Sequence, residues 1–472
     1  MRNQSKSIAY LFTKSIALTL FPIILYLLGL NLLAVIAVEV FIILCYLCLK
    51  DLSSNIFFLG FLLSFFIFLM SGDIVADLFG EYYYIRFGKE AVRHSWIAIL
   101  ISLIFLYVGY ITKSKTTKIR LKSSSGSLNV YKIQNAAKIL FYLTYCILLF
   151  NTIDKILFVR RYGYVAYYSS YSPLLPSIIA EFGDFTPILL CVYLATFPIK
   201  KDAKIPIFVY FIYAALALLI GARGELIYNA VFLIGYMFYR NKHDANGEVW
   251  LTKKAIILLS ISIPFILVFL FLYGYIRLGQ DVVYNSFGET LVNFFVNIGS
   301  SSTIIKYGYE YKDAIKTFKF YSLGDTINYF KYGKLFNLFN LNDIPSIHSA
   351  QFALEGHSLD AFLSYQFMKT QYLNGEGAGS SFVAVLFADF GYIGIAIGSF
   401  IYGMIFKSLS NLNSKSWLST SIKLFFFLLL IKAPRGSYDS FLGGIININF
   451  WIVIFGVIIV AQCLTGSKKR SE

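Results

Sequence analysis

Residues 355–406 read EGHSLDAFLSYQFMKTQYLNGEGAGSSFVAVLFADFGYIGIAIGSFIYGMIF, and the two halves of this stretch differ in character. The first half is polar and ionisable, whereas the apolar run that begins near residue 382 is long enough to cross a bilayer. Between them the glycines of 375–379 allow tight turns, because glycine has no Cβ to clash at positive φ. Asp389 lies inside the apolar run, where a carboxylate is costly unless it has a partner, so it is a functional candidate.

Composition places the whole chain in the membrane class. Of its 472 residues, 58% are hydrophobic and only 14% are charged, whereas about a quarter of the residues of a soluble domain are charged. Apolar runs of membrane-spanning length recur along the chain, and the ~10-residue alternating segments of a transmembrane β-barrel do not. We therefore expect an all-α polytopic membrane protein.

The apolar runs predict about twelve transmembrane helices. They lie near residues 9–28, 31–49, 54–71, 95–111, 136–152, 184–199, 205–220, 226–239, 255–275, 382–406, 417–431 and 444–463. Alternation from a cytoplasmic N-terminus places every short basic loop inside, as the positive-inside rule requires. The net charge of +16 gathers at the ends of these runs, so it indicates a topology with both termini in the cytoplasm and no nucleic-acid partner.

Three segments follow from this topology. We expect a transmembrane bundle of about nine helices over 1–275, one large extracytoplasmic loop over 276–381, and C-terminal transmembrane helices over 382–472. The loop is near neutral and rich in aromatic residues, with a dense series of tyrosines at Tyr307, Tyr309, Tyr311, Tyr321, Tyr329 and Tyr332. Such a surface suits sugars, whose apolar faces stack on rings, but an interfacial aromatic belt would have the same composition.

Three arginines stand at the predicted outer membrane boundary, where the positive-inside rule disfavours them. They are Arg223, Arg277 and Arg435, and a further pair, Arg160 and Arg161, follows the fifth run. Guanidinium groups at one depth suit a diphosphate, because the planar fork forms paired, charge-assisted bonds to phosphate oxygens. The alternatives are snorkelling side chains and helix-end ion pairs, for example between Arg223 and Glu225.

Four short motifs then carry a family resemblance. The sequence GEGAGSSFVAVLFADFGYIGIAIGSFIYG over 375–403 resembles the signature of the oligosaccharide repeat unit polymerases, the Wzy family of O-antigen and capsule polymerases. The segments 221–225 (GARGE), 356–360 (GHSLD) and 434–437 (PRGS) are similar to further parts of that pattern, and they occur in the same order. The resemblance spans roughly the second half of the chain.

The resemblance implies a fold, a substrate and a place in the cell. Such an enzyme has a glycosyltransferase C-like fold in the bacterial cytoplasmic (inner) membrane and works on the extracytoplasmic side. It transfers a growing glycan from polyprenyl diphosphate to the non-reducing end of a new undecaprenyl-diphosphate-linked oligosaccharide. The lipid bilayer, a chain-length regulator and a flippase of the same pathway would be its partners.

The resemblance also implies roles for particular residues. Arg223, Arg277 and Arg435 would bind the diphosphate, and His357 would accept the proton of the attacking hydroxyl, because imidazole titrates near neutral pH. Asp360, three residues on, would orient the His357 ring on one helical face. Other predicted participants are the alternative bases Glu355 and His348 and, as substrate-binding or structural residues, Gly377, Gly379, Ser380, Asp389, Arg160 and Arg161.

We expect neither a cofactor nor a metal ion. Divalent ions at nucleotide-sugar sites are often held by a DxD carboxylate pair, which the predicted outer segments lack, and arginines would replace the ion. Three other functions stay open: an O-antigen ligase with the same donor, a flippase or transporter of lipid-linked oligosaccharide, and a non-catalytic scaffold. Charge gathered at one face favours an enzyme over a transporter, whose charges would line a central cavity.

Overall fold

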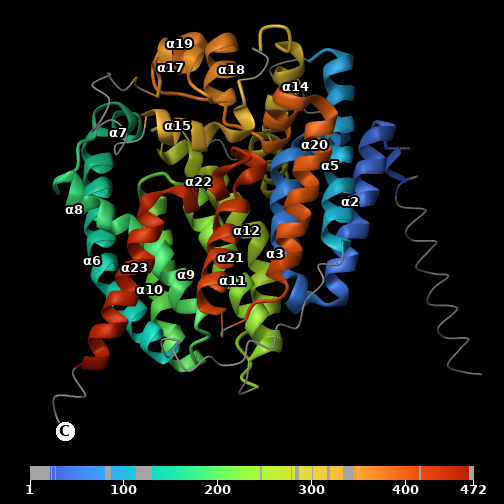
Figure 1. The fold of residues 1–472 in the computed structure, drawn as a ribbon. Coiled ribbons are helices and arrows are strands. Elements are labelled where there is room, and N and C mark those ends of the chain that lie inside the picture. The colour runs from blue at the N-terminus through green and yellow to red at the C-terminus, as the bar shows by residue number, and fades with distance from the viewer. Residues whose placement is uncertain are drawn as a thin grey trace, which may run out of the picture.

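The computed structural model describes residues 22, 24–26, 28–79, 87–112, 130–244, 247–277, 279–281, 286–299, 301–315, 319–332, 345, 347–413 and 416–466. Every regular element in these ranges is a helix (Figure 1). Helices satisfy their own backbone hydrogen bonds, which a segment surrounded by lipid must do. The all-α fold class is therefore confirmed.

The helices before the middle segment are α2 (Leu32–Lys50), α3 (Leu52–Phe65), η1 (Phe66–Met70), α4 (Ser71–Phe79), α5 (Lys89–Ile111), α6 (Val130–Tyr162), α7 (Tyr164–Ser170), α8 (Ser177–Glu181), η2 (Phe182–Phe185), α9 (Thr186–Ala195), α10 (Lys200–Leu219), α11 (Arg223–His243) and α12 (Lys253–Arg277). Those within and after the middle segment, residues 276–381, are α13 (Phe287–Ile298), α14 (Ser301–Glu310), η3 (Tyr321–Leu323), α15 (Gly324–Tyr332), α17 (Ala350–Glu355), α18 (Leu359–Phe367), α19 (Lys369–Leu373), α20 (Phe382–Leu409), α21 (Trp417–Leu430), η5 (Ala433–Arg435), α22 (Ser440–Ile446) and α23 (Ile448–Gly466).

Within the described ranges, nine helices are long and apolar enough to cross a membrane. A tenth span results if α22 and α23, which meet at a 50° bend, count as one. The predicted run at 9–28 lies largely outside the described residues, and the run at 226–239 falls in α11, whose terminal turns carry polar and charged residues that lower its mean hydropathy. The structure therefore confirms a polytopic membrane protein but not the count of twelve.

The two ends of the bundle differ. At one end, basic residues join neighbouring loops: the Lys242 ammonium pairs with Asp51 at 2.6 Å, and the Lys200 ammonium donates to the carbonyl of Val249 at 2.6 Å. The short helices α15, α17, α18 and α19 stack at the opposite end, away from the C-terminus (Figure 1). Lys200 and Lys242, both predicted to be cytoplasmic, thus lie in contacts between loops of one end, while the side on which each end lies stays a prediction.

The middle segment is divided between these helices and the bundle. Its first helices join the bundle, α13 against α4 and α12, and α14 against α5 and α20. The remaining helices stack on the end, where α15 packs on α22. The division into 1–275, 276–381 and 382–472 stays a prediction.

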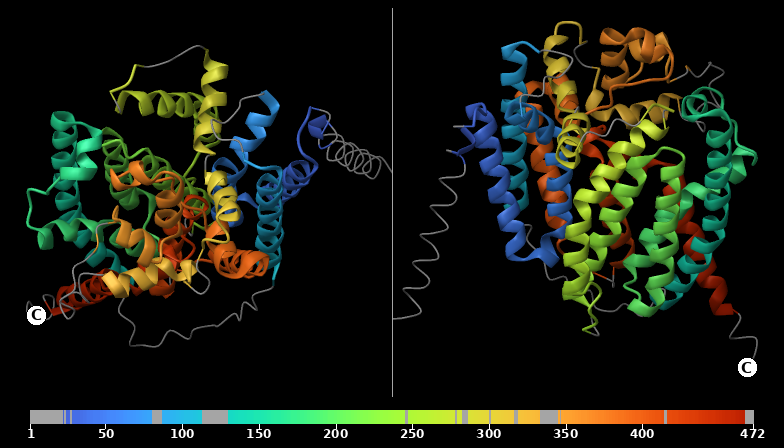
Figure 2. Two further views of the ribbon diagram at one scale, coloured as in Figure 1. Left: turned by 90° about the horizontal axis from the view of Figure 1, so that it is seen from above. Right: turned by 180° about the vertical axis from the view of Figure 1, so that it is seen from behind.

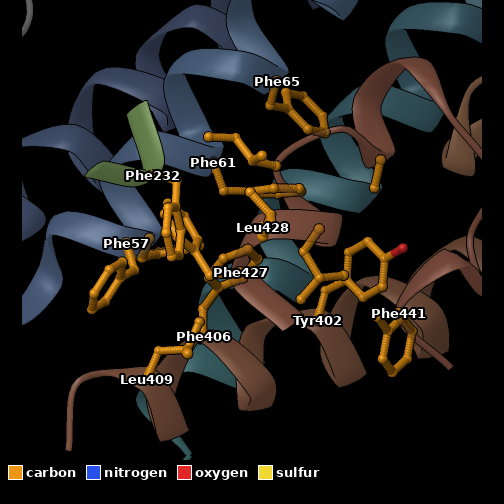
Figure 3. Close-up of a cluster of buried hydrophobic side chains, with 14 of the residues drawn as sticks. Phe57, Phe61, Phe65, Phe232, Tyr402, Phe406, Leu409, Phe427, Leu428 and Phe441 are labelled. Carbon is orange, nitrogen blue, oxygen red and sulfur yellow. The ribbon is translucent and has the colours of Figure 1, made fainter. Parts of the chain in front are cut away.

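Aromatic side chains of α3, α20 and α21 form the centre of the core (Figure 3). The rings of Phe57 and Phe427 lie 4.7 Å apart, and those of Phe61 and Phe406 lie 4.6 Å apart. Tyr402 stacks on Tyr438 at 4.9 Å and donates its hydroxyl proton to the Tyr438 carbonyl. Because these rings are buried, their packing fixes the position of Tyr438 relative to α20.

Helices α5 and α20 approach each other through small residues. A Cβ on Gly109 would lie 2.1 Å from the carbonyl oxygen of Phe400, and one on Gly403 would lie 2.2 Å from that of Leu106. The Ser102 and Ser399 hydroxyls bond across the same interface at 2.8 Å. Small residues let membrane helices pack at such short range, so this pair is held by backbone proximity.

Gly109→Ala is expected to destabilise the α5–α20 pair, because its methyl group meets a backbone carbonyl that cannot move aside. Overpacking of this kind costs about 1–3 kcal/mol, which a lower Tm of the detergent-purified protein would report. Gly456→Ala in α23 is the control, since a Cβ there meets nothing within 4 Å. Equal Tm values for the two variants would contradict this packing.

Candidate active site at one end of the helix bundle

Three arginines from separate helices gather at the end of the bundle that carries the stacked helices. Arg223 begins α11, Arg277 ends α12 and Arg435 ends η5, and the positive charges of Arg277 and Arg435 both act on Arg223. The ion pairs within the described ranges involve none of the three. Three cations without a carboxylate partner form a site of strong positive potential that suits an anion.

Arg223 is held by α12. Its Nη1 donates to the carbonyl of Leu270 at 2.8 Å, and a Cβ on Gly274 would lie 2.8 Å from the same nitrogen. Glycine at position 274 therefore makes room for the guanidinium. This contact fixes one face of the group against the helix and leaves its other donors available.

Arg277 is held by the loop before α11 and by α7. Its Nη1 donates to the Gly221 carbonyl at 2.9 Å and contacts the Tyr164 hydroxyl at 3.0 Å, and the guanidinium lies 4.5 Å from the Tyr164 ring centroid. A cavity of about 400 Å³ opens here, lined by Arg277, Gly221, Tyr164 and Tyr273 among others. The Arg277 side chain thus borders space that a ligand could enter.

Arg435 is the most open of the three. Its side chain is exposed, and its guanidinium carbon lies 5.8 Å from the ring centroid of Phe68 in the π-helix η1. The glycine-rich loop passes beside it: a Cβ on Gly379, whose φ is +79°, would lie 3.7 Å from the Arg435 Nε. A larger residue at 379 would be strained in this conformation and would crowd the guanidinium.

The predicted alternative of an ion pair between Arg223 and Glu225 is wrong. The Glu225 carboxylate pairs with the Lys432 ammonium at 2.9 Å and accepts from the Asn229 amide at 3.1 Å. Both charged side chains are about one third exposed, so the pair adds little stability. It does engage the acid two residues after Arg223, which forms no ion pair with Arg223 in the described structure.

The segment after Arg435 joins the bundle to the stacked helices. The fully buried Asp439 carboxylate accepts the backbone N–H groups of Asp325 at 3.2 Å and of Thr326 at 2.8 Å, which open α15. A carboxylate at a helix N-terminus satisfies free N–H groups and complements the helix dipole. The Ser437 hydroxyl also donates to the Asp325 carboxylate, so 435–439 and α15 are one connected unit.

Asp389 has partners that its apolar surroundings did not predict. Its carboxylate accepts the backbone N–H groups of Tyr321 at 2.9 Å and Ser322 at 2.6 Å. Two residues later Gly391 has φ 60° and ψ −150°, which breaks α20. Asp389 therefore anchors η3 to the first half of α20, and the substrate-binding role proposed as one option for it stays a prediction.

His357 lies against the first turns of α15. Its backbone N–H donates to the Asn328 side chain at 3.0 Å, and its carbonyl packs on Gly324. The ring Nδ1 contacts the Lys319 carbonyl. Because a carbonyl only accepts, Nδ1 carries the proton and Nε2 has the free lone pair, which is the tautomer that a base requires.

The predicted orientation of the His357 ring by Asp360 is wrong. His357 precedes α18 and does not share a helical face with Asp360. The Asp360 carboxylate accepts from Ser358, and no hydrogen bond joins it to the imidazole in the described residues. Asp360 instead acts electrostatically on Asp325.

The alternative bases lie in less suitable places. Glu355 is exposed at the end of α17 and accepts from Gln351 at 3.1 Å. The His348 ring lies 5.3 Å from that of Tyr372, and its Nδ1 is buried without a partner in the described structure. Among the predicted bases, His357 alone is fixed to α15 by several contacts.

The remaining predicted residues divide into two groups. Gly377 and Ser380 belong to the loop that passes Arg435, and Ser364 fixes this loop by accepting the Ala378 N–H at 3.1 Å. The second group is Arg160 and Arg161, which are exposed at the end of α6. No described contact brings either of them to the three arginines.

Several predicted sugar-binding tyrosines are core residues. Tyr307 is buried and stacks on Phe367 at 3.7 Å, and Tyr321 is 1% exposed. Tyr309 stacks on His94 at 4.7 Å. These rings therefore pack within the protein, and a sugar-binding role for them is not supported.

Asp325 is a candidate that sequence reasoning missed. Its side chain reaches solvent, although surrounding protein restricts its hydration. This desolvation, opposed by the Ser437 hydroxyl and reinforced by Asp439 and Asp360, raises the pKa of Asp325 to about 6. The sequence around Asp325 does not predict this raised pKa, because the neighbouring carboxylates Asp360 and Asp439 are more than thirty residues away along the chain.

Comparison with known proteins decides the family. The family model of the O-antigen polysaccharide polymerase Wzy matches residues 8–468. The chain belongs to this family. No curated protein and no solved structure matches it.

Membership in the Wzy family covers nearly the whole chain and so extends the resemblance from its second half to its first. At the level of the family, the protein is an O-antigen polymerase of the inner membrane that acts on lipid-linked oligosaccharide. The activity is of the glycosyltransferase kind. In the described part of the chain, no three His, Cys, Asp or Glu side chains gather in a way that could hold a metal ion.

Asp389→Ala is expected to loosen η3 from α20, because two backbone N–H groups lose a charged acceptor. Each such bond contributes about 1.5–3 kcal/mol, so amide exchange at Tyr321 and Ser322 should accelerate about tenfold or more. Hydrogen-exchange mass spectrometry measures this. Asp313→Ala, at an exposed turn, is the control, and unchanged exchange in the Asp389 variant would refute the anchoring role.

The raised pKa of Asp325 predicts pH-dependent stability. Its folded pKa of about 6 exceeds the unfolded value of about 3.9, so the folded state binds the proton more tightly and loses stability as pH rises from about 4 to 6. Asp325→Asn removes this titration and keeps an oxygen for Ser437. The Tm of the variant should therefore exceed that of the wild type by an amount that grows up to about pH 7 and is constant above it. A difference independent of pH would contradict the assignment.

Proposed function

We propose that this protein extends a lipid-linked glycan at the site formed by Arg223, Arg277 and Arg435. The donor is a glycan on polyprenyl diphosphate, and the acceptor is the non-reducing end of a new polyprenyl-diphosphate-linked repeat unit. One observation carries the proposal: three guanidinium groups that have no acidic partner among the described residues lie together where α11 begins and where α12 and η5 end. The family acts on lipid-linked oligosaccharide, and in this proposal the link between lipid and glycan is the diphosphate that the arginines bind.

The reaction forms one bond and breaks one. An acceptor hydroxyl attacks the anomeric carbon of the donor's reducing-end sugar, and the bond from that carbon to the diphosphate oxygen breaks. Polyprenyl diphosphate leaves with the electron pair. The arginines bind the charge that develops on this leaving group, a contribution usually large in such transfers, and so serve in place of a divalent ion.

His357 takes the proton of the attacking hydroxyl. Support comes from its tautomer, since Nδ1 is occupied by the Lys319 carbonyl and Nε2 is free to accept. Its carbonyl packs on Gly324, the residue before Asp325, and Asp325 accepts from Ser437, two residues after Arg435. The backbone of the proposed base and the segment that follows Arg435 thus both contact the first turn of α15.

The site end of the bundle faces the extracytoplasmic side in this proposal, and both termini are cytoplasmic. The clustering of Lys50, Lys200 and Lys242 at the opposite end supports this orientation, given the positive-inside rule. A flippase delivering the repeat units and a chain-length regulator would be its partners in the membrane.

A polymerisation assay with purified protein tests the proposal. A synthetic lipid-linked repeat unit should yield a ladder of products that survives a chelator. Arg435→Ala should reduce the rate about ten- to hundredfold, the cost of a lost charge-assisted bond, and Arg435→Lys by less, because lysine keeps the charge without the fork. His357→Ala should abolish the ladder without loss of donor binding.

Arg93→Ala is the matched control, since Arg93 is an exposed arginine in α5. A ladder that persists in the Arg435 and His357 variants would refute the residue assignment. A single transfer to a different acceptor would indicate a ligase, and intact substrate moved across liposomes would indicate a transporter.

A further inference from the structure

Helix α12 stands apart from the rest of the bundle. Only 17% of the residues in its apolar window are buried, against 39–61% for the other eight candidate spans. It packs chiefly on α13 and makes no extensive contact with α10 or α11 (Figure 2). Its upper end is nevertheless fixed, because Leu270 accepts from Arg223 and Arg277 donates to Gly221.

An apolar groove occupies the space beside α12. It has a volume of about 330 Å³ and is lined by α10, α11 and α12, mainly through Phe208, Phe211, Ala230, Leu233, Met237 and Leu259. The lysines Lys200 and Lys204 lie at its far end. In a bilayer such a groove contains hydrocarbon, since water in an apolar channel would be unfavourable.

The groove shares helix faces with two of the arginines, Arg223 and Arg277. On α11, Arg223, Ala230 and Met237 follow one another at intervals of seven residues, about two turns. On α12, Leu259 and Arg277 are 18 residues apart, which is five full turns. At 1.5 Å per residue the groove at Leu259 therefore lies about 27 Å below Arg277.

The intervening part of this path is also apolar and open. Between the groove and the cavity at Arg277, α10 presents Phe211, Ala215 and Leu219 as exposed residues at helical spacing. Leu219 lines the upper cavity and Phe211 the lower groove. Exposed apolar residues of α10 therefore connect the two openings along that helix, and α12 borders both openings. We call this path along α10 and α12 the apolar track.

We propose that this track holds the polyprenyl chain of the donor whose diphosphate the three arginines bind. The proposal rests on the proposed function and adds the site of the lipid. Charge complementarity selects the occupant, because the track ends at the cavity beside Arg277, whose positive charge acts on Arg223 together with that of Arg435. The length of the track also favours a polyprenyl chain. At about 27 Å the track nearly spans the ~30 Å hydrocarbon core, whereas a phospholipid acyl chain reaches only about half of that core.

Two substrates with one glycan test the proposal, one on an undecaprenyl chain and one on a chain of two isoprene units. Ala230→Trp and Ala215→Trp fill the track, and Ile397→Trp on an exposed face of α20 is the matched control. The ratio of kcat/KM for the long over the short lipid should fall about tenfold in the track variants, which corresponds to 1.4 kcal/mol. With the short lipid, the track variants should react as the wild type does. The control variant should match the wild type with both lipids.

Equal losses with both lipids, or no loss with either, would overturn the proposal. A second readout does not need turnover: a photoreactive group at the far end of the prenyl chain should label peptides of α10 or α12, and Ala215→Trp should remove this labelling. Labelling of these peptides by an anionic phospholipid probe alone would assign the groove to a bulk lipid and overturn the proposal. Prenyl labelling without any polymer would leave the lipid site standing and refute the proposed function.

Discussion

The buried carboxylate of Asp439 is the contact on which the site depends. It accepts the N–H groups of Asp325 and Thr326 in the first turn of α15, so it fixes the stacked helices to the chain that leaves α21. Asp389 does the same for η3 from within α20. Both acids are satisfied by backbone donors, which is how a buried charge is tolerated. Both acids are therefore engaged, and in the described part of the chain the three arginines form no ion pair.

This division of charge creates the site. Lys306 pairs with Asp73, Lys432 with Glu225 and Arg240 with Asp244, whereas Arg223, Arg277 and Arg435 are held by carbonyls, a hydroxyl and aromatic rings. Like charges kept close repel one another, so the arrangement costs stability until an anion binds. A ligand with several negative charges relieves this repulsion among the arginines more fully than a single carboxylate does, so the site favours such a ligand.

Glycines set the distances in this arrangement. Gly274 admits the Arg223 guanidinium beside α12, Gly379 lets the loop pass Arg435, and Gly391 breaks α20 just after Asp389. Each lies where a side chain would occupy the space of a functional group or would require a disfavoured φ. The missing side chain of Gly109 likewise lets α5 and α20 come into backbone contact. Glycine thus allows close packing both in the helix bundle and at the site.

The sequence by itself determined the class of the molecule and the arginines. Apolar runs predicted a polytopic helical protein, and the short motifs around Arg223, His357, Gly379 and Arg435 indicated the family, because hydrophobic length and local motifs are properties of contiguous residues. Only the tertiary structure decided the partners. Glu225 binds Lys432 instead of Arg223, Asp360 does not reach the His357 ring, and Asp325 meets Ser437 from 112 residues away. Partner choice depends on how helices distant in sequence pack against one another, and no local pattern encodes that.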